Sequence, residues 1–321
     1  KTHASYNSPR HYEIPAATLH EGENLIVIRV EDTGGEGGIW GDAKELYLEV
    51  DGKRYDLAGE WEYRPSVKTT MYGLAGRGTY SNPNSFASLL YNGMIAPLVP
   101  YTVKGFLWYQ GESNRPNPTQ YRALMPAFVK MLRERWAQGE LPFYYVQIAP
   151  YRYDGPDAIS GALLREAQLH NLKDIPSSGM AVTLDIGDEG CIHPAKKEEV
   201  GTRLAWLALS KTYGMKGIDA DTPVCEKMEV ADGKAYLTFA TGPDGLAPYG
   251  RTLTGFEMAG RVFPPATARI EKGKSRLIVA CDAVPEPVAV RYAFRNVPEA
   301  TLFNTSGIPA SSFRTDDWEV K

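Results

Sequence analysis

The sequence is poor in cysteine, has no long apolar run and lacks an excess of basic residues. Its three cysteines, Cys191, Cys225 and Cys281, are widely spaced, which excludes a zinc ribbon and a CxxC redox motif. No run of about 18 apolar residues occurs, so we expect no membrane span. Lysine and arginine total 35 against 39 for aspartate and glutamate, which makes the net charge −4. A nucleic-acid partner is therefore not expected, because such proteins carry a basic excess or a basic stripe.

What the chain does contain is the composition of a globular protein. Its 321 residues are 43% hydrophobic and 23% charged, which excludes a disordered chain, a collagen-like fibre and a coiled coil. A chain of this length predicts about two or three domains and a sizeable core. The 31 glycines and 23 prolines favour many turns and short strands.

Three regions follow one another along the sequence. Residues 1–65 contain short alternating runs at 25–32 and 44–57, which predict a partial β-sandwich or jelly-roll domain. Residues 66–215 alternate strand and helix patterns, which predicts an α/β domain with a parallel sheet and helices on both faces. Residues 216–321 return to β-like segments, and we expect this β-rich region to pack back on the α/β domain.

The α/β region has the most regular pattern. Its first helix is expected to bury one apolar face, made by Tyr121, Leu124, Phe128, Leu132 and Trp136. Ligands of such folds bind beyond the carboxyl ends of the strands, so the loops 110–118 and 187–194 are expected to lie together. The elements predicted are strands over 103–109, 142–149 and 179–186 and helices over 119–136, 158–172 and 194–214.

The first of these loops directly follows an apolar strand and reads Trp108-Tyr109-Gln110-Gly111-Glu112-Ser113-Asn114. The glycine permits a tight turn that points several polar groups into one cleft. Gln110 or Asn114 can supply an amide N–H to a developing oxyanion. Glu112 can orient a histidine, act as an acid or bind a sugar hydroxyl. The alternative is an ordinary polar turn in which Glu112 caps a helix.

The second loop runs from Asp185 to Pro194 and carries His193, which stands where an α/β sheet would hold a catalytic base. Asp185 and Asp188 are acids that can hold its imidazole in the required tautomer. The alternatives are a capping or core histidine and solvated loop carboxylates. The spacing matches no standard metal-ligand motif, so neither a metal nor a cofactor is expected. Cys191 lies in an acidic loop that would not activate a thiol, and we expect it to be buried and structural.

Several segments resemble the sialate O-acetylesterase family, a carbohydrate-esterase branch of the SGNH hydrolases. "KGFLWYQGESN" is similar to its signature and "DIGDEGCIHPAKKEEVGTRLA" to its histidine block, and further similar segments extend the resemblance over nearly the whole chain. The resemblance implies that residues 66–215 form an SGNH-like hydrolase domain and residues 1–65 part of an inserted β domain. It implies a periplasmic or extracellular location as well.

The implied reaction is removal of an acetyl group from a sugar hydroxyl, with an acetylated sugar or glycan as substrate. A serine attacks the ester, and a histidine takes its proton and returns it to the sugar oxygen. His193 matches the family histidine. Gln110 and Glu112 match the block near the catalytic centre, where they are expected to support the oxyanion and organise the site. We further assign Asp185 a catalytic role, and Trp108 and Asn114 a role in substrate binding.

The chain departs from the family pattern in two places. Many members carry an aspartate two residues before the histidine, where this chain has Cys191, so the acid that orients His193 stays open. The family nucleophile lies in a G-Q-S-N-M-like segment that does not occur here. Ser113 has the most similar context, but the family gives that position another role. We therefore expect the nucleophilic serine on an N-terminal segment or partner chain outside these residues.

Two other classes of function stay open. A glycosidase would use two carboxylates, for instance Glu112 and Asp185, and would keep its activity in His193→Ala. A non-catalytic carbohydrate-binding protein would bind a glycan and hydrolyse no acetyl ester.

Overall fold

The computed structural model describes residues 9–30, 39, 41–62, 88–242, 245–260, 262–271 and 275–319. The chain divides into two compact units, Lys1–Pro97 and Leu98–Lys321. The domain boundaries expected after residues 65 and 215 stay a prediction.

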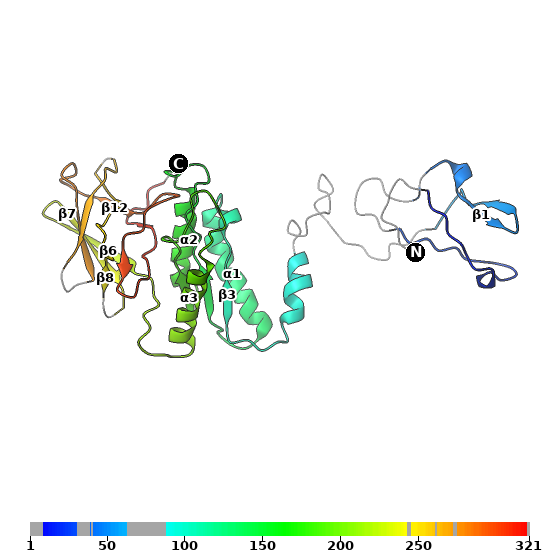
Figure 1. Ribbon diagram of the computed structural model, residues 1–321, viewed down its shortest axis with the longest axis horizontal. Helices are drawn as coiled ribbons and strands as arrows, with labels where there is room; N and C mark the ends of the chain where they lie inside the picture. The colour runs from blue at the N-terminus through cyan, green and yellow to red at the C-terminus, as the bar shows by residue number, and fades with distance from the viewer. Residues whose placement is uncertain are drawn as a thin grey trace. The chain divides into compact units, whose positions relative to one another are not determined.

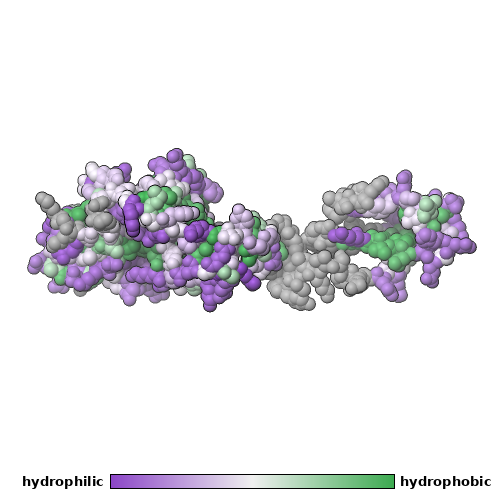
Figure 2. Space-filling view, turned by 90° about the horizontal axis from the view of Figure 1, so that it is seen from below, coloured by the Kyte–Doolittle hydropathy of each residue, from purple (hydrophilic) through white to green (hydrophobic). Residues whose placement is uncertain are grey.

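The described part of the first unit contains a β-hairpin, made by β1 (Tyr47–Val50) and β2 (Lys53–Asp56). Its turn places Asp51 at φ 50° and Gly52 at φ 74°, the backbone that an Asp-Gly hairpin turn favours. The strand expected over 25–32 is wrong for 25–30, which adopt no regular structure, and 31–32 lie outside the described residues. Leu25, in this segment, is 90% exposed. An alternating pattern forms a strand only where a neighbouring strand pairs with it, and in the described part of this unit β1 and β2 pair only with each other. Figure 2 shows the resulting hydrophobic surface on this unit.

The second unit is built around a parallel three-stranded sheet in the order β3-β4-β5, which confirms the predicted fold class. The strands are β3 (Phe106–Trp108), β4 (Phe143–Val146) and β5 (Ser178–Ala181). The connecting helices are α1 (Pro118–Trp136), α2 (Ser160–Asp174) and α3 (Lys197–Leu207), and Figure 1 shows them along the sheet.

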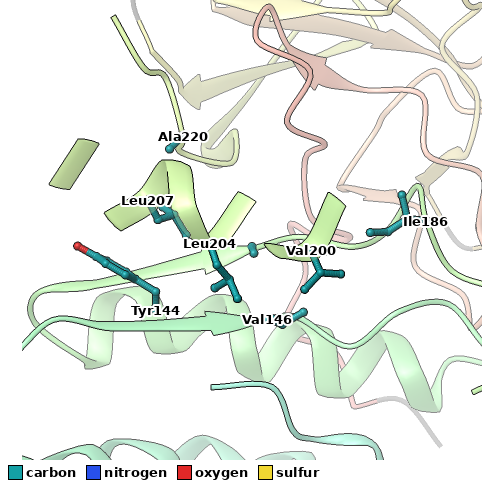
Figure 3. Packing of buried hydrophobic residues seen from close by; sticks show 8 residues of the cluster. Tyr144, Val146, Ile186, Val200, Leu204, Leu207 and Ala220 are labelled. Carbon is teal, nitrogen blue, oxygen red and sulfur yellow. The ribbon is translucent and has the colours of Figure 1, made fainter. Parts of the chain in front are cut away.

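The alternation of side chains along β4 explains why both faces of the sheet carry helices. Tyr144 and Val146 point to one face, where they pack with Val200 and Leu204 of α3 and with Ile186 (Figure 3). The alternate residues point to the opposite face. There Phe143 contacts an aromatic side chain of α1, and the hydroxyl of Tyr145 donates to a backbone oxygen of α2. All four residues of β4 are buried, as a strand covered on both sides requires.

Two expectations about the helices need correction. Leu124 of α1 is 50% exposed, and the buried stripe runs instead through Tyr121, Met125, Val129, Leu132 and Trp136. Steps of three and four residues keep that stripe on one side of the helix, and Leu124 falls outside it. The third helix starts at Lys197 rather than Pro194, because residues 190–196 form the loop that carries His193. It continues as a π-helical turn, η7 (Ala208–Thr212).

Antiparallel sheets form the C-terminal region beside α2 and α3 (Figure 1). One sheet has the order β10-β11-β7-β6, another β14-β12-β9, and a short pair joins β13 to β8. The strands are β6 (Val224–Ala231), β7 (Lys234–Ala240), β8 (Leu246–Ala247), β9 (Phe256–Ala259), β10 (Thr267–Ile270), β11 (Arg276–Ala280), β12 (Ala289–Tyr292), β13 (Phe303–Asn304) and β14 (Phe313–Arg314).

Polar side chains join the chain's last residues to the α/β layer. Gln147, at the end of β4, donates to the hydroxyl of Ser311 at 2.7 Å. Arg314 binds both carboxylate oxygens of Glu166 on α2, at 2.7 and 3.0 Å. These contacts hold the C-terminal region against the helices that support the site.

Candidate functional site

The loop after β3 is pressed against the sheet at Gly111. A Cβ on this residue would lie 2.9 Å from Cγ2 of Ile148 and 3.2 Å from Nε2 of Gln168, so only glycine fits without displacing its neighbours. Gln168 is itself buried, and it accepts from the backbone N–H of Ile148 at 2.9 Å. The predicted tight turn is therefore fixed by close packing against β4 and α2.

Gln110 and Asn114 face each other across this turn. The Nε2 of Gln110 donates to Oδ1 of Asn114 at 2.7 Å, and the hydroxyl of Tyr121 donates to the backbone oxygen of Gln110 at 3.0 Å. Because Asn114 uses its oxygen here, its NH₂ group is directed elsewhere, and one N–H of Gln110 is also left over. Amide donors for a developing negative charge are thus available in this loop.

Glu112 opens a short 3₁₀ turn, η6 (Glu112–Asn114). Its half-buried carboxylate makes no hydrogen bond among the residues that the structure describes. Burial, together with the negative charge of Glu112, raises the pKa of the Tyr153 hydroxyl to about 12. That hydroxyl is also buried and has no hydrogen-bond partner in the described part of the chain. Tyr153 therefore stays protonated across the physiological range.

The loop after β5 holds its carboxylates in different ways. The two oxygens of Asp185 accept from the guanidinium of Arg203 at 2.7 and 2.6 Å, and Arg203 also donates to the backbone oxygen of Val182. Oδ1 of Asp188 accepts from the backbone N–H groups of Gly190 and Cys191 at 2.8 and 3.2 Å, which closes a turn. The catalytic role assigned to Asp185 stays a prediction.

His193 is exposed, and its ring makes no hydrogen bond within the described ranges. The expectation that Cys191 is buried is wrong: the thiol is free and exposed, and it donates to the backbone oxygen of His193 at 3.3 Å. The loop therefore fixes the backbone at His193 and leaves the imidazole open to a partner.

Close packing also joins the loops after β4 and β5. A Cβ on Gly187 would lie 2.5 Å from Cδ and 2.7 Å from the backbone oxygen of Pro150. Arg152 reinforces this contact, since its guanidinium binds Glu189 at 2.5 Å. The position of the loop from Asp185 to Pro194, called the histidine loop from here on, therefore depends on the segment that follows β4.

A contact between Tyr109 and Lys197 links the loop after β3 to the histidine loop. The Nζ of Lys197 lies 3.3 Å from the Tyr109 hydroxyl and 4.7 Å from the ring centroid. Lys197 opens α3, shortly after His193, and Tyr109 directly precedes Gln110. Both predicted loops therefore reach the same end of the parallel sheet. That Gln110, Glu112 and His193 line one cleft stays a prediction.

Trp108 lies below the loop rather than at its rim. Its ring packs on Phe128 of α1 at 4.7 Å between centroids and near Phe143 of β4 at 6.5 Å. This contact places the indole in the aromatic core under the loop. The substrate-binding roles assigned to Trp108 and Asn114 stay predictions.

Several polar residues around the site were not singled out from the sequence. Arg165 of α2 is fully buried, and burial lowers its pKa to about 10. Its Nη1, and Oε1 of Gln147, have no hydrogen-bond partner in the described residues. Asn296 accepts from the backbone N–H of Gly161 at 2.7 Å and donates to Asp154 at 2.7 Å. Gln147 could have been identified from the sequence as a buried polar residue, because it is the polar residue within the apolar run "FYYVQIAP".

The described residues offer neither a membrane-spanning helix nor a cluster of metal ligands. No helix there combines the length and apolar character that crossing a membrane requires. No group of three or more histidine, cysteine or acidic side chains there is arranged to hold a metal ion.

Residues 75–210 match a family described as carbohydrate esterase, sialic acid-specific acetylesterase. Human sialate O-acetylesterase is 34% identical over 170 residues, and the alignment covers 47% of this chain and 32% of that protein. The mouse protein is 32% identical over 171 residues, with the same coverage. The crystal structure of a carbohydrate acetylesterase from Xanthomonas citri has a TM-score of 0.70 and 40% identity, over 74% of this chain and 56% of that one. The chain thus spans about a third of the length of the curated relatives it matches.

Proposed function

We propose that the protein is a carbohydrate esterase that removes acetyl groups from sugar hydroxyls, because residues 75–210 match the family described as carbohydrate esterase, sialic acid-specific acetylesterase. The exposed imidazole of His193, which has no hydrogen bond within the described ranges, carries this proposal. A histidine base must bind a hydroxyl directly, and a ring already bonded to the protein on both sides has no nitrogen left for it.

The reaction is an acyl transfer in two halves. A serine Oγ attacks the acetyl carbonyl carbon while His193 takes the hydroxyl proton, and the carbonyl oxygen becomes a tetrahedral oxyanion. The amide groups of Gln110 and Asn114, which are hydrogen-bonded to each other in the loop after β3, would donate to that oxyanion. When the intermediate collapses, the C–O bond to the sugar breaks and His193 returns its proton to the sugar oxygen. Water, activated by the same imidazole, then hydrolyses the acetyl-serine ester.

The nucleophilic serine is proposed to come from outside these 321 residues, on a strand that pairs with β3. Within the described residues β3 pairs only with β4, and its central residue Leu107 is 62% exposed. Parallel sheets are normally covered on both faces, so an exposed leucine on an edge strand is unusual. A parallel strand beside β3 would end at the same sheet edge as Gln110. A serine at that strand's carboxyl end would therefore face the loop that carries the amide donors.

The test compares two proteins, the 321-residue chain and the complete gene product. We expect the 321-residue chain to hydrolyse p-nitrophenyl acetate no faster than its His193→Ala variant, since the imidazole has no serine to activate. The complete product is expected to be active, and His193→Ala should lower its kcat by about 10³-fold or more, as loss of a triad base does.

Each alternative predicts a different result in the same assay. Strong activity of the 321-residue chain that disappears in Ser113→Ala would place the nucleophile in this chain and refute the outside serine. An inactive complete product would refute the esterase itself. A glycosidase would keep its activity on glycosides in His193→Ala.

A further inference from the structure

A buried asparagine of the C-terminal region, Asn296, joins two segments of the α/β layer. Its Oδ1 accepts from the backbone N–H of Gly161 at 2.7 Å. Its Nδ2 donates to Oδ1 of Asp154 at 2.7 Å and to the backbone oxygen of Gly155 at 2.9 Å. The side chain is fully buried, and both of its polar atoms have partners, as a buried amide requires. One side chain therefore holds the loop after β4 against the start of α2.

The start of α2 depends on this contact because its own N-cap residue supplies none. Ile159 occupies the N-cap position, and its side chain makes no capping hydrogen bond. Polar N-cap side chains normally accept from the first free N–H groups of a helix. Oδ1 of Asn296 accepts from one of these groups instead. A Cβ on Gly161 would lie 3.0 Å from that oxygen, so the glycine admits its close approach.

Arg115 connects this arrangement to the loop after β3. It directly follows Asn114, and its Nη1 donates to the hydroxyl of Ser160 at 2.7 Å. The same nitrogen lies 3.4 Å from Oδ1 of Asp154. The guanidinium also lies over the ring of Tyr153, 4.6 Å from its centroid. The end of η6 is therefore held by the carboxylate that the buried asparagine binds.

The loop after β4 carries backbone strain at Tyr153. Its φ of 37° is a conformation that bulky residues rarely adopt. The ring contacts that of Tyr151 edge-on, at 4.9 Å between centroids. Strain of this kind persists only where the surrounding contacts impose it, and it is concentrated at functional sites. The bonds from Asn296 to the two following residues, Asp154 and Gly155, supply such contacts.

We propose that Asn296 is a positioning residue for the amide donors of Gln110 and Asn114. It acts through its contact with Asp154, whose carboxylate lies at the guanidinium of Arg115. The proposal rests on the proposed function, because these donors matter to the reaction only if an oxyanion forms. Since the oxyanion develops in the transition state and not in the bound substrate, displaced donors should lower kcat more than they change KM.

Hydrogen exchange, followed by NMR, measures how firmly the loop is held without any hydrolysis. The backbone N–H groups of Asn114 and Arg115 donate within the turn to Gly111 and Glu112, at 2.8 and 3.2 Å. In the 321-residue chain, Asn296→Ala should speed exchange of these two groups about tenfold or more. The amides of β4 should keep their rates, because a local release leaves the sheet intact.

Asn304→Ala provides a matched control. Asn304 is as fully buried as Asn296, and its Oδ1 accepts from the backbone N–H of Ile308 at 2.8 Å. Its Nδ2 donates to Asp219 at 3.2 Å, so both of its polar atoms are likewise bonded. These partners lie away from η6 in the sequence and in its contacts. The control variant should leave the exchange of the loop amides as it is in the unmodified chain.

Activity of the complete gene product gives the second measurement. Asn296→Ala should lower kcat about ten- to a hundredfold, as a displacement of about 1 Å does, and change KM less than about threefold. Asn296→Asp would place two carboxylates face to face. Adding Asp154→Asn puts an amide donor opposite an acceptor again and should restore part of the kcat. Arg115→Met, a milder change nearer the surface, should speed the same exchange and lower kcat.

Each outcome decides for or against the positioning role. Unchanged exchange of the loop amides in both Asn296→Ala and Arg115→Met, or an equal increase in Asn304→Ala, would overturn it. In an active product, an unchanged kcat in Asn296→Ala would overturn it as well. An inactive complete product would refute the proposed function instead, and hydrogen exchange would still decide whether Asn296 holds the loop.

Discussion

Substituting one glycine in the histidine loop tests whether packing against Pro150 positions that loop. In Gly187→Ala the new Cβ would approach three atoms of Pro150, at 2.5, 2.7 and 2.8 Å. These distances fall 0.6–0.9 Å short of an ordinary 3.4 Å contact. Neither a proline ring nor a backbone oxygen can rotate away. The loop must therefore move by nearly an ångström.

The magnitude follows from two opposing effects. Overpacking a tight contact costs about 1–3 kcal/mol. Replacing glycine by alanine also restricts the unfolded chain, which stabilises the folded state by about 0.4–1 kcal/mol. The net expectation is a loss of about 1–2 kcal/mol, or roughly 2–8 °C in Tm for a domain of 150–250 residues.

Gly190 provides a matched control in the same loop. A Cβ there would meet only Oδ1 of Asp188, at 3.6 Å, and its N–H bond to Asp188 would remain. Gly190→Ala should therefore be neutral or slightly stabilising. Urea and thermal unfolding of both variants measure the difference, and kcat of the complete gene product reports the displacement of His193. If Gly187→Ala is as stable and as active as Gly190→Ala, the packing argument is refuted.

Three further predictions concern residues that hold the site or the chain end. Gly111→Ala should lower Tm by a few degrees in thermal unfolding, because its Cβ would come within 2.9 Å of a neighbour. Arg203→Lys loses the two-point contact to Asp185 and should cost about 1–3 kcal/mol in urea unfolding. Burial alone would raise the pKa of Asp316, but the neighbouring guanidinium groups of Arg291 and Arg314 together outweigh burial and hold the pKa below 3.8. The stability from Asp316 is therefore complete above pH 3.8 and lost as pH falls further. Asp316→Asn should be about 3–5 kcal/mol less stable at pH 7, with a flatter acid profile by circular dichroism.

The α/β layer was predictable because the apolar positions in its sequence are the positions that the structure buries. The run around Phe143–Val146 is apolar throughout, as expected of a parallel strand covered on both faces. Alternation of such runs with helical periodicity leaves few topologies open, and the right-handed crossover reduces them further.

The wrong expectations arose where tertiary contacts decide the outcome. The pattern at 25–30 has strand character, but the first unit offers it no pairing strand among the described residues. Leu124 fits a helical spacing, and only the direction in which α1 packs excludes it from the buried stripe. Cys191 is exposed in a loop whose turn is closed by Asp188, and the sequence pattern does not encode which side of such a loop faces solvent.

The site was predictable to the level of loops but not of partners. The chemistry-bearing loops follow strands of one parallel sheet, so the sheet edge alone predicts their proximity. That Arg203 binds Asp185, or that Asn296 binds the start of α2, depends on how distant segments pack. Such pairs leave no spacing pattern in a single sequence.

Hydrogen-bonding capacity helps to decide which acid orients His193. Asp185 has both oxygens bound by Arg203, and Asp188 uses Oδ1 to close a turn. The carboxylate of Glu112 accepts no hydrogen bond among the described residues, and its loop is joined to the histidine loop through Lys197. An orienting acid needs an uncommitted oxygen at the imidazole, since a carboxylate already paired with a guanidinium attracts a second cation weakly. On this ground Asp185 is the weakest candidate, while Oδ2 of Asp188 and the carboxylate of Glu112 are both uncommitted among the described residues, so the acid that orients His193 stays a prediction.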